Sequence, residues 1–157
     1  MKLFYGLNPA FIRSLANITE RKMNFLGDVF KEEGTTDRTL RVQEFGKVRV
    51  ETSRQGSVAL SDVGTVLGEM MFLGMRTISQ ATFRAATPLL VMLWIPHHSF
   101  ENIINDGYPF EGAYFRSLQR TDHGREDMSH YAHDLKLFRG CGQSFLNRFI
   151  VQVGFQN

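Results

Sequence analysis

Residues 88–96, PLLVMLWIP, contain the longest uninterrupted apolar run of the chain. Seven apolar residues from Leu89 to Ile95 stand between two prolines, far fewer than the roughly 20 that a membrane-spanning helix requires. A run of this length without a polar side is typical of a strand that is buried on both faces. We therefore predict a central strand at 89–95.

The sequence before this run alternates between apolar and charged residues from Thr39 to Thr52, which favours strands with one charged face. The Phe45-Gly46 step is either a bulge in one long strand or a tight turn between two short ones. Residues 57–60 are expected to add a short strand. The apolar members of the pattern are Leu40, Val42, Val48 and Val50, and the opposed charged members are Lys47, Arg49 and Glu51.

Spacings of three and four residues predict several helices. Asn8-Pro9 is a typical helix start, and the apolar residues that follow predict a long N-terminal helix that ends before Gly34, with Gly27 as the position where it could break. A second helix is expected from Ser61 or Asp62 to Gly74, a shorter one at 79–86, and one or two turns at 99–105. Residues 112–120 are ambiguous between strand and helix. A last helix is predicted within 121–140, with Met128, Tyr131, Ala132, Leu135 and Phe138 as its apolar stripe.

The chain ends in an alternating segment that predicts a closing strand at 149–155. No repeat or long polar linker divides the sequence. We therefore expect a single domain over residues 1–157, of the α+β class, in which a mainly antiparallel sheet packs against three or four helices, the longest of them N-terminal.

Length and charge exclude several classes of protein. At 157 residues the chain is long enough to bury about 70% of its unfolded surface, and its formal net charge of +2 implies no polyanionic partner by itself. One cysteine excludes an internal disulfide and any multi-cysteine metal site. The N-terminal segment lacks the apolar core of a secretory signal, so we expect a cytoplasmic protein or one built into a particle that assembles inside the cell.

The composition favours a protein that works through its surfaces. The chain has 14 phenylalanines, 7 methionines, and 13 arginines against 5 lysines, a balance that is typical of protein interfaces. We therefore predict a structural or adaptor subunit of a larger assembly, such as a virus particle or secretion apparatus, with copies of itself or other proteins as partners. The expected interface residues are Phe25, Val29 and Phe30, and at the closing strand Phe149, Val151, Val153 and Phe155.

A metal-binding protein or metal-dependent enzyme is the first alternative. Glu126, His130 and His133 follow an i, i+4, i+7 spacing within the predicted helix at 121–140, so they share one face and could ligate one ion. That face points away from the apolar stripe, which favours a solvated helix face over a catalytic site. No G-x-S-x-G sequence occurs, so we expect no enzyme and no cofactor.

A nucleic-acid-binding module is the second alternative. Arg38, Arg41, Lys47 and Arg49 cluster around the first predicted strands, close to Phe45. Glu44 and Glu51 lie among them, and acidic residues weaken the attraction for phosphates. A charged outer face of the sheet is therefore the favoured interpretation of these residues.

Overall fold

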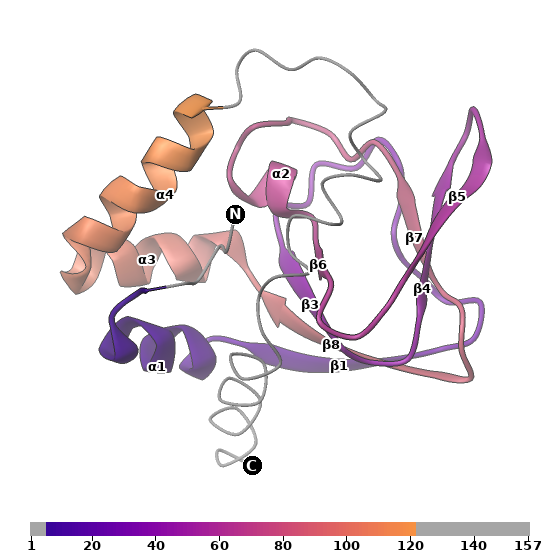
Figure 1. Ribbon diagram of the computed structural model, residues 1–157, viewed down its shortest axis with the longest axis horizontal. Helices are drawn as coiled ribbons and strands as arrows, with labels where there is room; N and C mark the ends of the chain where they lie inside the picture. Colours follow the sequence, from indigo (N-terminus) through magenta and orange to yellow (C-terminus); the bar gives the residue numbers. More distant parts are fainter. Residues whose placement is uncertain (1–5, 122–157) are drawn as a thin grey trace.

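The apolar run at 89–95 forms strand β8 (Leu89–Ile95), and the prediction of a buried central strand is confirmed. In the computed structural model, which describes residues 6–121, β8 is flanked by β1 (Glu20–Phe25) and β3 (Leu40–Phe45), and β6 (Val66–Leu67) adds the outer edge (Figure 1). The order of this first sheet is β1-β8-β3-β6, and every strand pair in it is antiparallel.

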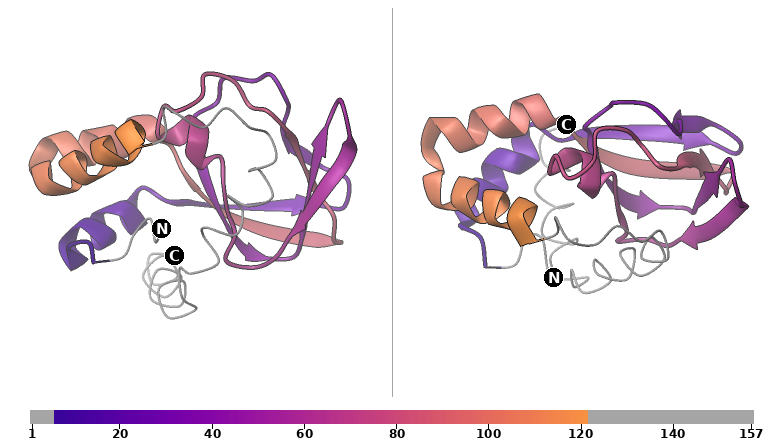
Figure 2. Two further views of the ribbon diagram at one scale, coloured as in Figure 1. Left: turned by 45° about the horizontal axis from the view of Figure 1, so that its top comes forward. Right: turned by 90° about the horizontal axis from the view of Figure 1, so that it is seen from above.

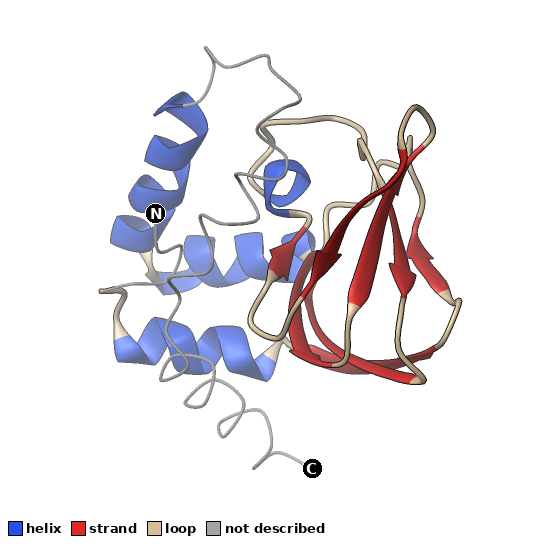
Figure 3. Cartoon of the chain, turned by 45° about the vertical axis from the view of Figure 1, so that its right-hand side comes forward, coloured by secondary structure: helices blue, strands red, loops and turns tan. Residues whose placement is uncertain are grey.

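A second antiparallel sheet faces the first. It contains β2 (Val29–Lys31), β7 (Thr82–Ala85), β4 (Val48–Thr52) and β5 (Gly56–Ser61), in the order β2-β7-β4-β5. Figure 3 shows the strands curving together into a roll, with the helices gathered beside it. The chain crosses between the sheets at short corners, one of them from β3 to β4 over Gly46 and Lys47.

Buried apolar side chains form two clusters, one on each side of the first sheet. The inner cluster lies between the two sheets and comprises Val48, Val50, Leu67, Ala81, Phe83, Ala85, Leu90 and Met92. The outer cluster lies between the first sheet and the helices, and its members include Phe11, Leu15, Leu40, Val42, Phe72, Leu73, Leu93, Ile95, Phe100, Phe115 and Leu118. Because side chains alternate along a strand, β8 contributes to both clusters.

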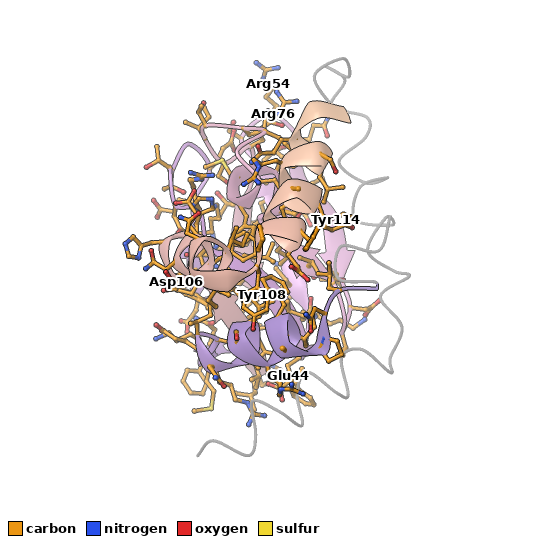
Figure 4. The ribbon with its side chains drawn as sticks, turned by 90° about the vertical axis from the view of Figure 1, so that its left-hand side faces the viewer. Glu44, Arg54, Arg76, Asp106, Tyr108 and Tyr114 are labelled. Atoms are coloured by element: carbon orange, nitrogen blue, oxygen red, sulfur yellow. The ribbon has the colours of Figure 1, made fainter. Side chains whose placement is uncertain are left out.

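Three helices cover the outer cluster: α1 (Pro9–Asn17), α3 (His97–Gly107) and α4 (Pro109–Thr121) (Figure 2). The rings of Phe100 and Phe115 meet edge to face at 4.9 Å between α3 and α4. Figure 4 shows this end of the molecule, with Tyr108 beside α1. There the Tyr108 hydroxyl hydrogen-bonds the Ser14 hydroxyl at 3.1 Å. No helix among residues 6–121 is long and apolar enough to span a bilayer.

The prediction of antiparallel sheet with several helices is confirmed, but the long N-terminal helix is wrong. Helix α1 starts at Pro9 as expected, capped by Asn8, and ends at Asn17. Beyond it, Phe25 belongs to β1 and Val29 to β2, and Gly27 turns the chain between them with φ +91, a conformation that no right-handed helix contains. Pairing of β1 with β8 overrides the helical spacing.

Two further predicted helices are also corrected. The apolar stretch at 62–74 contains β6 and only a single helical turn, α2 (Glu69–Phe72), because Gly64 and Gly68 have φ +89 and +84. Residues 79–86 contain β7 instead of a helix, since they pair with β2 and β4.

The other predicted elements within the described residues agree better with the structure. The alternating stretch at 39–52 is two strands separated by a tight turn, and these strands join different sheets. Residues 57–60 lie in β5, 99–105 lie in α3, and the ambiguous stretch 112–120 lies in α4. The predicted helix within 121–140 and the closing strand at 149–155 lie outside the described residues, except that Thr121 ends α4.

Gly46 is expected to be the least replaceable glycine of the described roll. Its φ is +84, and an added Cβ would lie 2.4 Å from the Leu89 carbonyl oxygen and 2.6 Å from the Thr87 hydroxyl. We expect Gly46→Ala to lower the free energy of unfolding, measured by urea denaturation, by about 1–3 kcal/mol more than Gly27→Ala. Gly27 also has a positive φ, but nothing lies within 4 Å of its added Cβ, so it isolates the backbone strain of about 1–2 kcal/mol. Equal losses in the two variants would contradict the close packing at Gly46.

Candidate functional site

Two cationic side chains are buried inside the roll. Lys31 of β2 lies opposite Phe83, and Arg41 of β3 lies opposite Leu67 and Trp94. Phe83 and Leu67 belong to the inner cluster, and Trp94 packs against it. Both cations therefore point between the sheets, Lys31 from the second sheet and Arg41 from the first. Lys31 is 4% exposed and Arg41 is 2% exposed. A buried charge without a partner costs several kcal/mol, so each cation needs a counter-charge.

Both cations share a single carboxylate, that of Asp37, in the loop between β2 and β3. An Arg41 Nη2 hydrogen is donated to Asp37 Oδ2. Lys31 Nζ donates to the Asp37 backbone carbonyl at 2.5 Å and lies 3.8 Å from Oδ2. The amide and hydroxyl of Thr39 donate to Asp37 Oδ1 at 3.1 and 2.7 Å. One carboxylate therefore faces two buried cations: it accepts a hydrogen bond from Arg41 and forms a longer ion pair with Lys31.

Hydrogen-bonding capacity is left over beside this cluster. Within the described part of the chain, three buried side-chain atoms lack a hydrogen-bond partner, and two of them, Arg41 Nε and Trp94 Nε1, belong to a stacked pair. The Arg41 guanidinium lies 4.4 Å from the centre of the Trp94 ring. By contrast, the amide of the buried Gln43 donates to the carbonyl of Ser61 and accepts from the Ser61 hydroxyl. The unsatisfied donors are thus concentrated at Arg41 and Trp94.

The titration behaviour follows from this crowding. Burial and the charge of Arg41 lower the pKa of Lys31, and the charges of Asp37 and Glu69 offset part of that effect. Burial alone would raise the pKa of Asp37, but the hydrogen bonds from Arg41 and Thr39 outweigh it and hold the pKa below its usual value. The carboxylate is therefore ionised at neutral pH and balances part of the positive charge.

The single helical turn α2 directly follows β6 (Figure 1), and its first residues lie next to this cluster. An added Cβ at Gly68 would lie 2.8 Å from the Thr39 carbonyl oxygen and 3.8 Å from Arg41 Nη1, so only glycine lets α2 approach this closely. Arg38 holds the other end of α2, because its Nε and Nη2 donate to the carbonyls of Met71 and Phe72 at 3.0 and 3.2 Å.

Arg38 also connects α2 with helix α3. Its Nη2 lies 2.7 Å from Nε2 of His97, the first residue of α3. A guanidinium can only donate, so Nε2 accepts and the ring is neutral with its proton on Nδ1. Burial and the charge of Arg38 lower the pKa of His97, against the opposing charge of Glu101. The Phe72 ring adds an apolar contact between the two helices, 4.6 Å from the Phe100 ring.

The structure does not bring the predicted nucleic-acid residues together on one surface. Arg38 binds α2 and His97, and Arg41 is buried inside the roll. Lys47 is exposed at a corner and pairs with Asp62 at 2.9 Å, and Arg49 is exposed on β4.

The other predicted site residues remain predictions. Phe25 is 62% exposed on β1 and Val29 is 37% exposed, whereas Phe30 packs against Phe83 with ring centres 6.1 Å apart. The remaining predicted residues lie outside the described part of the chain, namely Phe149, Val151, Val153 and Phe155 of the interface and Glu126, His130 and His133 of the metal site. Residues 6–121 contain no group of three His, Cys, Asp or Glu residues placed to hold a metal ion.

Sequence reasoning missed the roles of Lys31, Asp37 and Trp94. The available signal was weak: Lys31 follows the apolar pair Val29-Phe30, and Trp94 lies in the apolar run of β8. The pattern predicts an exposed position for Arg41, because a cation between Leu40 and Val42 has the spacing of a solvent-facing strand residue.

No protein-family model matches the chain, and a comparison with curated proteins gives no match. Solved structures do match its fold. The N-terminal domain of a transcriptional regulator from Streptomyces coelicolor A3(2) superposes with a TM-score of 0.64 at 24% identity, over 80% of this chain and 94% of that one. A putative cyclic nucleotide-binding protein from Geobacter metallireducens gives 0.62 at 18% identity, over 76% and 86% of the two chains.

The Thermus thermophilus catabolite activator protein also matches, with a TM-score of 0.61 at 22% identity over 86% of this chain. The chain spans only 61% of the length of that protein. These likenesses overturn the prediction of a structural or adaptor subunit and lend no support to incorporation into a particle. At these identities they show the fold: the described residues have the roll-and-helix architecture that also occurs in regulatory domains.

Proposed function

We propose that this chain is a regulatory sensor domain that binds a small anionic molecule between its two sheets and transmits the bound state to its helices. The observation that carries the proposal is the buried pair Lys31 and Arg41, with donors on Arg41 and Trp94 left unpaired. Burying two cations beside one carboxylate costs stability, and a buried charge cluster of this kind is a candidate for a functional site. Binding an anion from solution is such a purpose.

The surroundings of the cations favour a ligand with a flat apolar part. Trp94 stacks on Arg41, and the inner cluster supplies apolar walls on both sheets. A nucleotide joins an anionic phosphate to a flat base and would use both features. One of the matched structures is that of a putative cyclic nucleotide-binding protein, which makes cyclic nucleotides the first compounds to test.

The contacts of α2 suggest how binding reaches the helices. Gly68 places α2 against the cation cluster, and Arg38 holds the carbonyls of α2 and the ring of His97 together. A shift of α2 therefore changes a hydrogen bond at the start of α3, and α3 packs on α4 through Phe100 and Phe115. This connected set of contacts is the route that we propose for the signal.

The first test is binding of cyclic nucleotides, linear mononucleotides and small carboxylates to the full chain, measured by calorimetry. We expect at least one class to bind and Arg41→Gln to weaken that binding about tenfold or more, since a hydrogen bond from a charged donor contributes about 1.5–3 kcal/mol. Arg49→Gln, which removes the same charge from an exposed position of β4, is the matched control and should leave affinity unchanged. Equal affinity for the Arg41 variant and the wild type would refute the site.

Lys31→Met separates a functional cation from a structural one. Methionine keeps the length of the side chain and removes both the desolvation cost and the repulsion by Arg41, while Asp37 keeps Arg41 as its partner. We expect the melting temperature at pH 7 to stay equal or rise while ligand affinity falls. Lys47→Met at the exposed corner is the control for loss of charge. A clear fall in the melting temperature, specific to Lys31, would mean that this lysine serves stability.

Arg38→Gln tests the connection between α2 and α3. Removing the guanidinium removes a positive neighbour and the donor to Nε2, so we expect the pKa of His97 to rise, as measured by NMR titration. In the wild type the folded pKa is below that of the unfolded chain, about 6.5. The contribution of the neutral His97 ring to the free energy of unfolding is therefore fully present above that value and decreases as the pH falls below it. This decrease should be smaller in the variant. Arg54→Gln, in the turn before β5, should leave the His97 titration unchanged.

A further inference from the structure

We propose that the Asp37 carboxylate is an internal substitute for the ligand: it fills the anion subsite of Lys31 and Arg41 in the unliganded chain, and the anionic group of the ligand replaces it. This inference rests on the proposed function and adds the residue that competes with the ligand for the cations.

The exposures of the three side chains show from which side an anion can arrive. The Lys31 and Arg41 side chains are 1% and 2% exposed, whereas that of Asp37 is 40% exposed. The two cations are fixed in opposed strands, and the carboxylate belongs to a loop. An anion that comes from solution therefore reaches the cations most directly by taking the position of the Asp37 carboxylate.

Asp37 satisfies the cations only in part. Its Oδ2 accepts a hydrogen bond from one nitrogen of Arg41, so the guanidinium and the carboxylate form no bidentate pair. Arg41 Nε stays without a hydrogen-bond partner. Lys31 Nζ lies 3.8 Å from the same oxygen and donates to the backbone carbonyl instead. An anion with three acceptor oxygens, such as a phosphate or sulfate group, offers more acceptors than this one carboxylate does. The exchange therefore gains hydrogen bonds.

The displaced carboxylate keeps partners of its own. The amide and hydroxyl of Thr39 both donate to Oδ1, the oxygen that does not contact Arg41. Displacement of Oδ2 thus leaves a partly solvated, hydrogen-bonded carboxylate and not a buried unpaired charge. A neutral ligand cannot balance the cations that Asp37 would leave, so the mechanism selects for a negative group.

The test uses Asp37→Asn in the full chain, with inorganic sulfate as the probe. Melting temperatures are measured while sulfate replaces chloride at constant ionic strength. For each variant, the sulfate midpoint is the sulfate concentration that gives half of the full rise in melting temperature, and it is compared with that of the wild type. Asparagine retains an acceptor oxygen but removes the competing charge, so we expect the variant to be less stable in chloride. Its sulfate midpoint should be about tenfold lower than that of the wild type.

Two controls assign the effect to this subsite. Asp106→Asn removes one charge from the exposed surface of α3 and measures the general stabilisation that sulfate gives to any protein. The double variant Asp37→Asn with Arg41→Gln should lose the added response to sulfate. If Asp37→Asn does not fold in chloride, folding restored by sulfate is the expected result.

Two outcomes overturn the inference: a sulfate response of Asp37→Asn equal to that of Asp106→Asn, or an unfolded variant that sulfate does not restore. Failure of the proposed function looks different. In that case no compound of the binding panel binds the wild type, although sulfate still rescues Asp37→Asn. If instead a compound binds the wild type and sulfate has no added effect on the variant, the sensor function stands and the role of Asp37 is wrong.

Discussion

Strand β8 has no face that meets solvent, and the rest of the architecture follows from this constraint. Leu90 and Met92 project into the inner cluster, while Leu93 and Ile95 project into the outer one. A strand of this kind needs neighbours on both edges and cover on both faces. Here β1 and β3 supply the edges, the second sheet covers one face, and the helices cover the other.

This constraint also decides what the sequence could predict. The apolar run at 89–95 between prolines predicted the central strand, and the alternation at 39–52 predicted strands, because both patterns result from burial. The N-terminal prediction failed beyond Asn17 because Phe25 and Leu26 have helical spacing by coincidence: both are more than 60% exposed. Phe25 pairs with Leu89 of β8, and Leu26 begins the turn that follows β1, so a contact distant in the sequence determines this segment and no local pattern reports it.

The candidate site could be predicted even less well. Arg41 alternates with Leu40 and Val42 as a solvent-facing residue would, yet apolar residues cover both faces of its sheet. In such a sheet, the polar residues that alternate with apolar ones along a strand point into a second core instead of into water. Lys31 and Arg41 are brought together by the closure of the roll, and Arg38 meets a histidine 59 residues away. These are properties of the topology, which the sequence patterns left open.

Trp94 is the single tryptophan of the chain, and it stacks on the guanidinium of Arg41. The indole emission of the protein therefore comes entirely from one wall of the roll, next to the cation that we assign to the ligand. A cation against the ring and a buried Nε1 without an acceptor both influence the excited state of indole. The fluorescence of Trp94 thus reports on the proposed ligand site without any added label.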